Sequence, residues 1–172
     1  MTKAEIHSFE SILQNLPKKI LYNRCNDAVA ECVLYDISRD ICLNFVEVAY
    51  FIYNPDFHLC KGMAGINRKE IDSWQDDPWQ NITNFQNTVK NTHYNKKIKK
   101  TEFCTTISNN NLEAIINEIK KSIEMEYASI HHWNLQNNNT GILLYHCNDG
   151  TQNRQTSEIE NAAILLSFCP IC

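Results

Sequence analysis

The segment that most constrains the fold is an apolar stretch at residues 41–53, which reads ICLNFVEVAYFIY. Its β-branched and aromatic residues are those that pack best on the pleated surface of a sheet. Asn54 and Pro55 follow directly, and this pair is typical of a turn. Residues 41–53 are therefore predicted to form a strand in the core of the protein.

The preceding segment, residues 28–37, reads AVAECVLYDI, and a polar break at residues 38–40 separates it from the predicted strand. Its richness in valine and isoleucine favours a second strand, antiparallel to the first. Val29, Val33 and Ile37 also fit the period of a helix. A helix over residues 28–37 is therefore the alternative.

Three other segments have the apolar period of an amphipathic helix. The first covers residues 3–16, and Pro17 is expected to end it. The second begins at Asp77 and Pro78, because aspartate can cap a first turn and proline fits within it. The third begins near Asn110, at a sequence with the spacing of a capping box.

Shorter elements are predicted between these helices. Residues 57–60 are expected to form a short strand, and Gly62 and Gly65 to open a loop before a helical piece at residues 68–74.

The last third of the chain has further strand-like segments. Residues 128–133 and 141–147 are predicted to be strands. The apolar residues 162–168 are predicted to form another strand, with a helix capped at Thr156 or Ser157 as the alternative.

Strands in two groups with helices between them predict an α+β fold rather than a regular alternation of strand and helix. We expect a mostly antiparallel sheet packed with about three or four helices. At 172 residues and 43% hydrophobic residues, the chain has the size and composition of one ordinary domain. The prediction is a single α+β domain spanning residues 1–172.

The charge of the chain does not favour nucleic acid as a partner. The formal net charge is −4, from 16 basic and 20 acidic residues, so the chain as a whole does not attract phosphate backbones. The densest basic stretch places five lysines within residues 90–100. We interpret it as a solvated helix end and loop rather than an RNA-binding surface.

The expected compartment is the cytoplasm, without membrane attachment. No stretch approaches the roughly 18 apolar residues of a membrane helix, and the first residues lack the apolar region of a signal peptide. The eight cysteines are then expected to be reduced thiols rather than a disulfide framework.

One window of the chain resembles PAS-type sensor domains. VAYFIYNPDF at residues 48–57, followed by GINRKEIDSW at residues 65–74, is similar to their order of strand, turn and helix. The resemblance implies a small-ligand sensor. Such a function would be favoured by an apolar pocket between residues 41–53 and the helix after Pro78.

The chain ends on a candidate metal-binding motif. Residues 164–172 read ILLSFCPIC, in which Cys169 and Cys172 are spaced as C-P-x-C. Two thiolates at this spacing can occupy two of the four positions around zinc. The ending resembles that of small zinc-ribbon proteins, in which a strand runs into C-P-x-C. Those proteins continue with a glycine and a return strand, which are missing here.

A structural Zn²⁺ site needs two further ligands. Cys147 is the first candidate, because it ends a predicted strand directly before a polar turn. His58 and Cys60 come next, since they project from the same face of an extended segment. The alternative for each cysteine is that it packs as a small apolar side chain.

The sequence motifs favour binding over catalysis. The chain has no H-E-x-x-H motif and no H-x-E followed by P-C-x-x-C, and G-M-A-G at residues 62–65 lacks the spacing of a phosphate loop. We therefore expect a small intracellular module that binds a protein partner, such as an inhibitor, an immunity-type protein or an effector.

Two alternatives come from other classes of function. One is the PAS-like sensor. The other is a cysteine- or zinc-dependent hydrolase, in which Cys60 with His58, or Cys147 with a nearby histidine, would supply the thiolate and its base. Glu47, within the 41–53 strand, is interpreted as a solvent-facing position.

Overall fold

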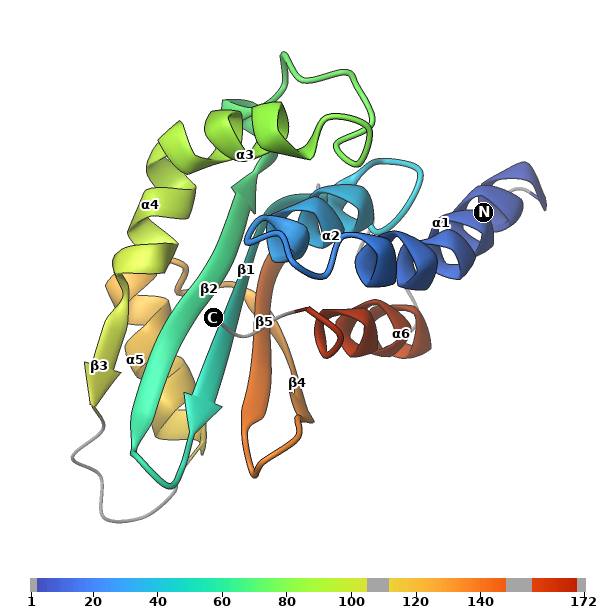
Figure 1. Cartoon of the computed structure of the whole chain (residues 1–172). Helices are drawn as coiled ribbons and strands as arrows, with labels where there is room; N and C mark the ends of the chain where they lie inside the picture. The colour runs from blue at the N-terminus through green and yellow to red at the C-terminus, as the bar shows by residue number, and fades with distance from the viewer. Residues whose placement is uncertain (1–2, 105–111, 148–155, 170–172) are drawn as a thin grey trace.

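A computed structural model describes residues 3–104, 112–147 and 156–169. In that part of the chain, six α-helices and one short 3-10 helix accompany a five-stranded antiparallel sheet of order β3-β2-β1-β5-β4 (Figure 1). The helices are α1 (Lys3–Tyr22), α2 (Val29–Ser38), η1 (Arg68–Glu70), α3 (Ile82–Asn91), α4 (His93–Lys100), α5 (Leu112–Ile123) and α6 (Thr156–Leu166). The strands are β1 (Phe45–Asn54), β2 (Leu59–Asn67), β3 (Glu102–Cys104), β4 (Ser129–Asn134) and β5 (Thr140–Cys147). The predicted α+β class is confirmed, and the predicted three or four helices are too few.

The strand predicted from residues 41–53 is β1, the centre of the sheet, but it begins at Phe45 because residues 41–44 form a turn. β1 pairs with β2 on one side and with β5 on the other. Its side chains alternate between the two faces, so that Tyr50 enters one core cluster and Phe51 the other. Burial on both faces explains why the segment is apolar at almost every position.

Two hydrophobic cores lie on the two faces of the sheet. The first core contains side chains from β1, β5, α1, α2, α3 and α6, and α1, α2 and α6 lie together on that side (Figure 1). The second core contains side chains from β1, β2, β5, α4 and α5. Each face of the sheet is therefore covered by its own set of helices.

The strand predicted for residues 28–37 is wrong, and the helical alternative is correct. Eight of the ten residues of α2 are buried, because the sheet, α1, α3 and α6 all pack around it. A helix that is covered on most sides carries apolar residues at most positions and loses its amphipathic period. For residues 162–168 the helical alternative is also correct, because they belong to α6, which begins at Thr156, and to the turn after it.

Pro17 does not end the first helix. α1 continues to Tyr22, although an internal proline removes a hydrogen bond and costs about 3 kcal/mol. Leu16 and Ile20, on either side of the proline, are fully buried in the first core. Burial of these two side chains offsets the cost of the proline.

Gly62 and Gly65 lie within β2 rather than in a loop. Both glycines face α4, and a β-carbon at Gly62 would overlap the carbonyl oxygen of Ile98. The PAS-like window therefore folds as a hairpin of β1 and β2 followed by one 3-10 turn. The predicted strand and turn are present, and the predicted helix is not.

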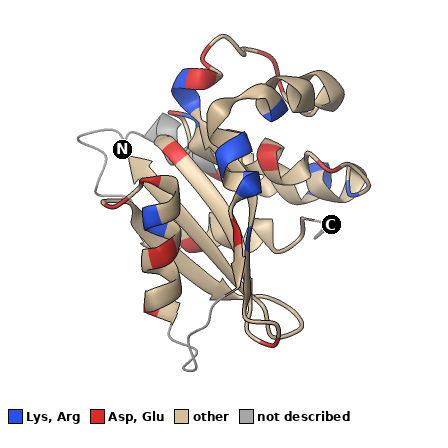
Figure 2. Cartoon of the chain, turned by 90° about the vertical axis from the view of Figure 1, so that its left-hand side faces the viewer, with Lys and Arg blue, Asp and Glu red and all other residues tan. Residues whose placement is uncertain are grey.

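The basic stretch at residues 90–100 comprises the end of α3 and the whole of α4, with Thr92 as the N-cap of α4, so it is helical where a loop was also expected. Tyr94, Asn95 and Ile98 are buried, and the lysines lie toward the outside. Figure 2 shows Lys and Arg mixed with Asp and Glu over the helices on this side, rather than gathered on one face.

The helix expected at Asp77 begins at Ile82, with Asn81 as its N-cap. The helix expected near Asn110 is described from Leu112 onward, and Asn110 lies outside the described residues. None of the described helices is long and apolar enough to span a membrane.

Candidate functional site

The proposed metal ligands do not come together in the described part of the chain. Cys60 is opposite Tyr53 on β1, whereas Cys147 is opposite Phe45. These positions are eight residues apart along one strand, which corresponds to roughly 25 Å. Cys60 and Cys147 therefore cannot bind the same ion in this fold.

Cys169 and Cys60 lie on opposite faces of the sheet, in the first and second cores respectively. His58 is exposed in the turn before β2, and Cys172 lies outside the described residues. Among the residues that the structure describes, no group of three or more His, Cys, Asp or Glu side chains is placed to hold a metal. The Zn²⁺ site has no support there and stays a prediction.

The local structure at the tail also differs from the ending of a zinc ribbon. In the described residues helix α6, not a strand, leads into Cys169. Its thiol lies 3.9 Å from the carbonyl oxygen of Leu165 and is buried. Burial raises the pKa of the Cys169 thiol to about 12.

The candidate nucleophile Cys60 has a similar environment. Its thiol is buried in the second core, and burial raises its pKa to about 12. Cys25, Cys32, Cys60, Cys104 and Cys169 are all reduced. A reactive cysteine needs a lowered pKa and access to solvent, and the Cys60 site provides neither.

A polar trio on the second face of the sheet was not predicted. Glu47 accepts a hydrogen bond from the Asn67 side chain at 2.9 Å, and its other oxygen lies 3.2 Å from Nδ1 of His146. The three residues come from β2, β1 and β5 and are neighbours only through strand register. Glu47 is half-buried and orients His146, rather than simply facing solvent as interpreted from the sequence.

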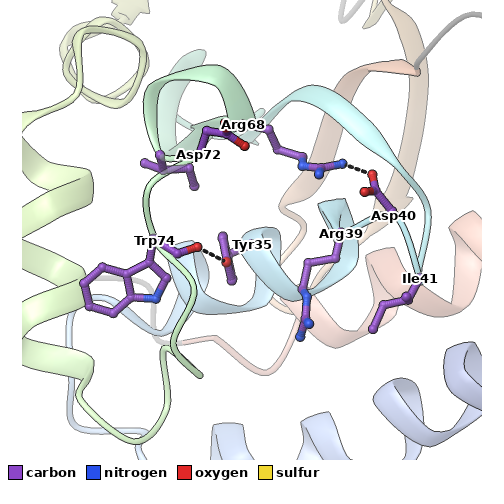
Figure 3. Close-up of a pocket in the computed structure, with 8 residues that line it drawn as sticks. Tyr35, Arg39, Asp40, Ile41, Arg68, Asp72 and Trp74 are labelled. Carbon is purple, nitrogen blue, oxygen red and sulfur yellow. Dashed lines mark hydrogen bonds and ion pairs between the residues drawn. The ribbon is translucent and has the colours of Figure 1, made fainter.

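Two adjoining depressions lie near the C-terminal end of α2, and Arg39 lines both. The smaller has a volume of about 170 Å³ and is lined by Tyr35, Arg39, Asp40, Ile41, Arg68, Ile71, Asp72 and Trp74 (Figure 3). The larger, of about 400 Å³, lies beside α1 and is lined by Ser11, Ile12, Asn15, Lys18, Lys19, Asp36, Arg39, Gln75, Asp76 and Asp77.

The loop that carries Arg39 is tightly folded. The Arg39 carbonyl accepts hydrogen bonds from the backbone of Cys42 at 2.9 Å and of Asn44 at 3.0 Å. Asn44 has a positive φ of 53°, which asparagine tolerates better than most residues. The chain therefore reverses within a few residues between α2 and β1.

Arg68 fixes this loop from the other side. Its guanidinium pairs with the Asp40 carboxylate and donates to Asn44 Oδ1 at 3.1 Å and to the Ser38 carbonyl at 3.4 Å. The hydrogen bond from Arg68 lowers the pKa of Asp40. Arg68 is therefore held by the protein itself.

Two aromatic residues that line the smaller depression, Tyr35 and Trp74, pack against Phe85. Phe85 makes edge contacts with both Tyr35 and Trp74, at centroid distances of 5.2 and 5.3 Å. The Tyr35 hydroxyl donates to the Trp74 carbonyl at 3.1 Å, and the Trp74 indole donates to the Asp76 carbonyl at 2.9 Å. These contacts hold the segment from Ile71 to Asp76 against α2.

The larger depression is organised around Asp36, a buried carboxylate on α2. Its oxygen accepts a hydrogen bond from the Trp79 indole at 2.8 Å and lies 3.6 Å from Nζ of Lys19. Lys19 also lies 3.4 Å from Asp77. Burial raises the pKa of Asp36, while Lys19 and Trp79 act in the opposite direction.

Arg39 differs from the neighbouring cations Lys19 and Arg68. Within the described part of the chain its exposed side chain makes no hydrogen bond or ion pair, and it extends between Tyr35 and Ile41 (Figure 3).

Comparisons with family models, curated proteins and solved structures gave no match. The chemistry of the site is therefore inferred from its own residues.

The lining of the depressions is suited to binding. Neither depression is lined by a cysteine or a histidine. The Tyr35 hydroxyl is engaged with Trp74, and burial raises its pKa. The side chains thus offer charge and aromatic surface.

The apolar pocket that would favour a PAS-like sensor was expected between β1 and the helix after Pro78. Phe85 and Val89, the buried residues of α3, instead pack into the first core together with Tyr50 of β1. Both depressions described here lie at the end of α2.

Proposed function

We propose that this protein is a binding module for a protein partner, of the inhibitor, immunity or effector type. The contact is made by the Arg39 surface, defined as Tyr35, Arg39, Ile41 and Trp74. The observation that carries the proposal is an exposed guanidinium that makes no hydrogen bond or ion pair with the described residues, set beside aromatic and aliphatic side chains.

The residue types support a protein partner. Arginine, tryptophan and tyrosine contribute most of the binding energy in protein interfaces. Small-molecule pockets are mostly apolar and enclosed. The smaller depression is instead open and lined by four charged residues, which suits the side chains of a second protein.

The partner is expected to present a carboxylate to Arg39. Arginine binds carboxylates through two parallel hydrogen bonds, which give both affinity and orientation. Lys19 and Arg68 are already paired with Asp36, Asp77 and Asp40. Of the two cations that line the smaller depression, Arg39 therefore remains for an acidic side chain of the partner.

Site-specific photo-crosslinking in cells of the source organism tests the proposal. A photoreactive amino acid at Ile41, which is partly exposed beside Arg39, should give a discrete adduct. The same probe at Tyr127, exposed and outside both depressions, should not give that adduct.

Charge reversal supplies the decisive comparison. Arg39→Glu should abolish the adduct formed at Ile41, whereas Lys121→Glu, an equal charge change on exposed α5, should leave it intact. Both variants should unfold at the wild-type denaturant concentration. An adduct that survives Arg39→Glu, or the lack of any adduct at Ile41, would contradict the proposal.

A further inference from the structure

Strand β4 is an edge of the sheet that lacks the usual protection. In the described part of the chain it pairs only with β5, so its outer side has no strand partner. Its sequence, SIHHWN, contains no charged residue and no proline, and its register with β5 has no bulge. Charged residues, prolines and bulges are features by which natural proteins commonly block pairing at an exposed edge.

The opposite edge of the sheet is different. β3 is only three residues long and pairs with residues 59–61 of β2. Helix α4 packs closely against β2, as the contacts of Gly62 and Gly65 with Ile98 show. The β4 side is therefore the edge that can accept another strand.

Helix α6 lies beside β4 and provides an apolar border. The Trp133 indole donates a hydrogen bond to the Ser167 hydroxyl at 2.8 Å, which joins β4 to the turn after α6. Ile164 and Phe168, four residues apart on that side, are 49% and 63% exposed. An added strand could cover both side chains.

The same border carries negative charge. Glu160 precedes Ile164 by one helical turn and is exposed. Its charge acts on His131 of β4, opposing the fall in pKa that burial imposes on that ring. Glu160 also lies about two turns before Ser167, which is bonded to Trp133, so it is on the side of α6 that faces β4.

The charge of the whole region decides between two occupants. Residues 125–147 and 156–169 contain three glutamates, at positions 126, 158 and 160, and no lysine or arginine, whereas Glu124, just before them, is paired with Lys97 of α4. A second copy of the chain would bring like charges together at this edge, which is unfavourable. A basic segment would be attracted.

We propose that the β4 edge, defined as β4 with Glu160, Ile164 and Phe168, binds an extended basic segment of a partner protein. The segment extends the sheet through backbone hydrogen bonds with β4. An apolar side chain of the segment covers Ile164 and Phe168, and a lysine or arginine pairs with Glu160. This surface shares no residue with the Arg39 surface, and its test is independent.

Three synthetic peptides of about eight residues test this surface. The first alternates valine and lysine, the second alternates valine and glutamate, and the third is the basic peptide with alternate backbone nitrogens methylated. Hydrogen exchange of the β4 amides, followed by NMR on the full chain, is the readout. Only the first peptide should slow exchange at residues 129–134.

Variants of the full chain separate sheet extension from general attraction. Glu160→Lys should weaken binding of the basic peptide about fivefold, and Phe168→Ser about tenfold. Glu118→Lys, the same charge change at an exposed position of α5, should have no effect. Unfolding curves should be unchanged in all three.

Four results would overturn the proposal. The first is that the methylated peptide binds as tightly as the basic peptide, and the second is that Glu160→Lys and Phe168→Ser bind the basic peptide with wild-type affinity. The third is that the basic peptide does not bind at all. The fourth is that protection of the β4 amides increases with protein concentration in the absence of any peptide. The last result would identify a second copy of the chain as the occupant.

Discussion

Replacing Gly62 by alanine tests the close packing of α4 on the sheet. The Gly62 backbone N–H donates to the Thr101 carbonyl at 2.9 Å, just beyond the end of α4. An added β-carbon would overlap the Ile98 carbonyl oxygen and lie 2.8 Å from the carbonyl carbon. These are backbone atoms of the helix, so the clash cannot be relieved by a side-chain rotation.

The sign of the effect depends on this contact. At an unobstructed strand position, replacing glycine by alanine stabilises a protein by about 0.5–1 kcal/mol. Here the end of α4 must move by about 1.5–2 Å to restore a normal separation of about 3.5–4.0 Å between the added β-carbon and the Ile98 carbonyl oxygen. Overpacking of this kind costs about 1–3 kcal/mol, and weakening the hydrogen bond to Thr101 about 1 kcal/mol more. We expect a net loss of about 2–3 kcal/mol.

Urea unfolding of Gly62→Ala measures this loss. With a slope of about 2 kcal/mol per molar, the midpoint should fall by about 1–1.5 M. Lys61→Ala, at the neighbouring partly exposed position of β2, should change the unfolding free energy by less than about 0.5 kcal/mol. A Gly62→Ala variant as stable as the wild type, or more stable, would refute the close approach of α4 to β2.

Three other predictions concern charge and thiols. The Glu31 carboxylate is only 4% exposed, and Nζ of Lys99 lies 2.6 Å from it. Lys99→Met removes this partner and should lower the free energy of unfolding in urea by about 2–3 kcal/mol. The expected loss is smaller than for a fully buried ion pair because Lys99 is 42% exposed. An equal loss of stability in Lys100→Met would contradict the prediction. The pKa of Asp40 is lowered in the folded state, so Asp40→Asn should cost less than about 1 kcal/mol at neutral pH, since Asp40 is 69% exposed. That loss of stability should disappear as the pH falls through the lowered pKa of Asp40. If the difference in unfolding free energy between wild type and Asp40→Asn were the same at neutral and at strongly acidic pH, the prediction would be wrong. The Cys169 thiol should react with an alkylating reagent only when the protein unfolds, because burial raises its pKa to about 12. About one zinc per chain, lost in Cys169→Ser, would instead support the predicted metal site.

The central strand and the fold class could be predicted because their signals are local. The apolar, β-branched character of residues 41–53 predicted a core strand, and all five residues of the FVEVA stretch lie in β1, although residues 41–44 belong to the loop before it. The identity of α2 could not be predicted in the same way. Its period is hidden by burial on most sides, and that burial is known only once α1, α3 and α6 are placed around it.

The glycines of β2 illustrate a second limit. Glycine usually interrupts a strand, so Gly62 and Gly65 indicated a loop. Their actual role depends on α4, some thirty residues further along the chain, which leaves no room for side chains at these positions. A tertiary contact of this length has no signature in the local sequence.

The candidate site was missed for a similar reason. Arg39 lies in a polar break between two apolar segments, where an arginine is unremarkable in sequence. It becomes a candidate only because residues 11–19, 35–41 and 68–77 meet around it. The cysteines and histidines attracted more attention in the sequence, and the fold places Cys60 and Cys147 far apart.

The buried carboxylates of α2 connect the frame of the protein to the proposed site. Glu31 pairs with Lys99 of α4, and Asp36 pairs with Lys19 of α1, so α2 is tied to helices on two sides. A buried carboxylate is costly without a partner, and each lysine is therefore retained by the fold. Neither of these two ion pairs involves Arg39, so Arg39→Glu should leave both of them in place. Loss of partner binding in Arg39→Glu would then report on recognition, whereas Lys19→Met would disturb α1 and recognition together.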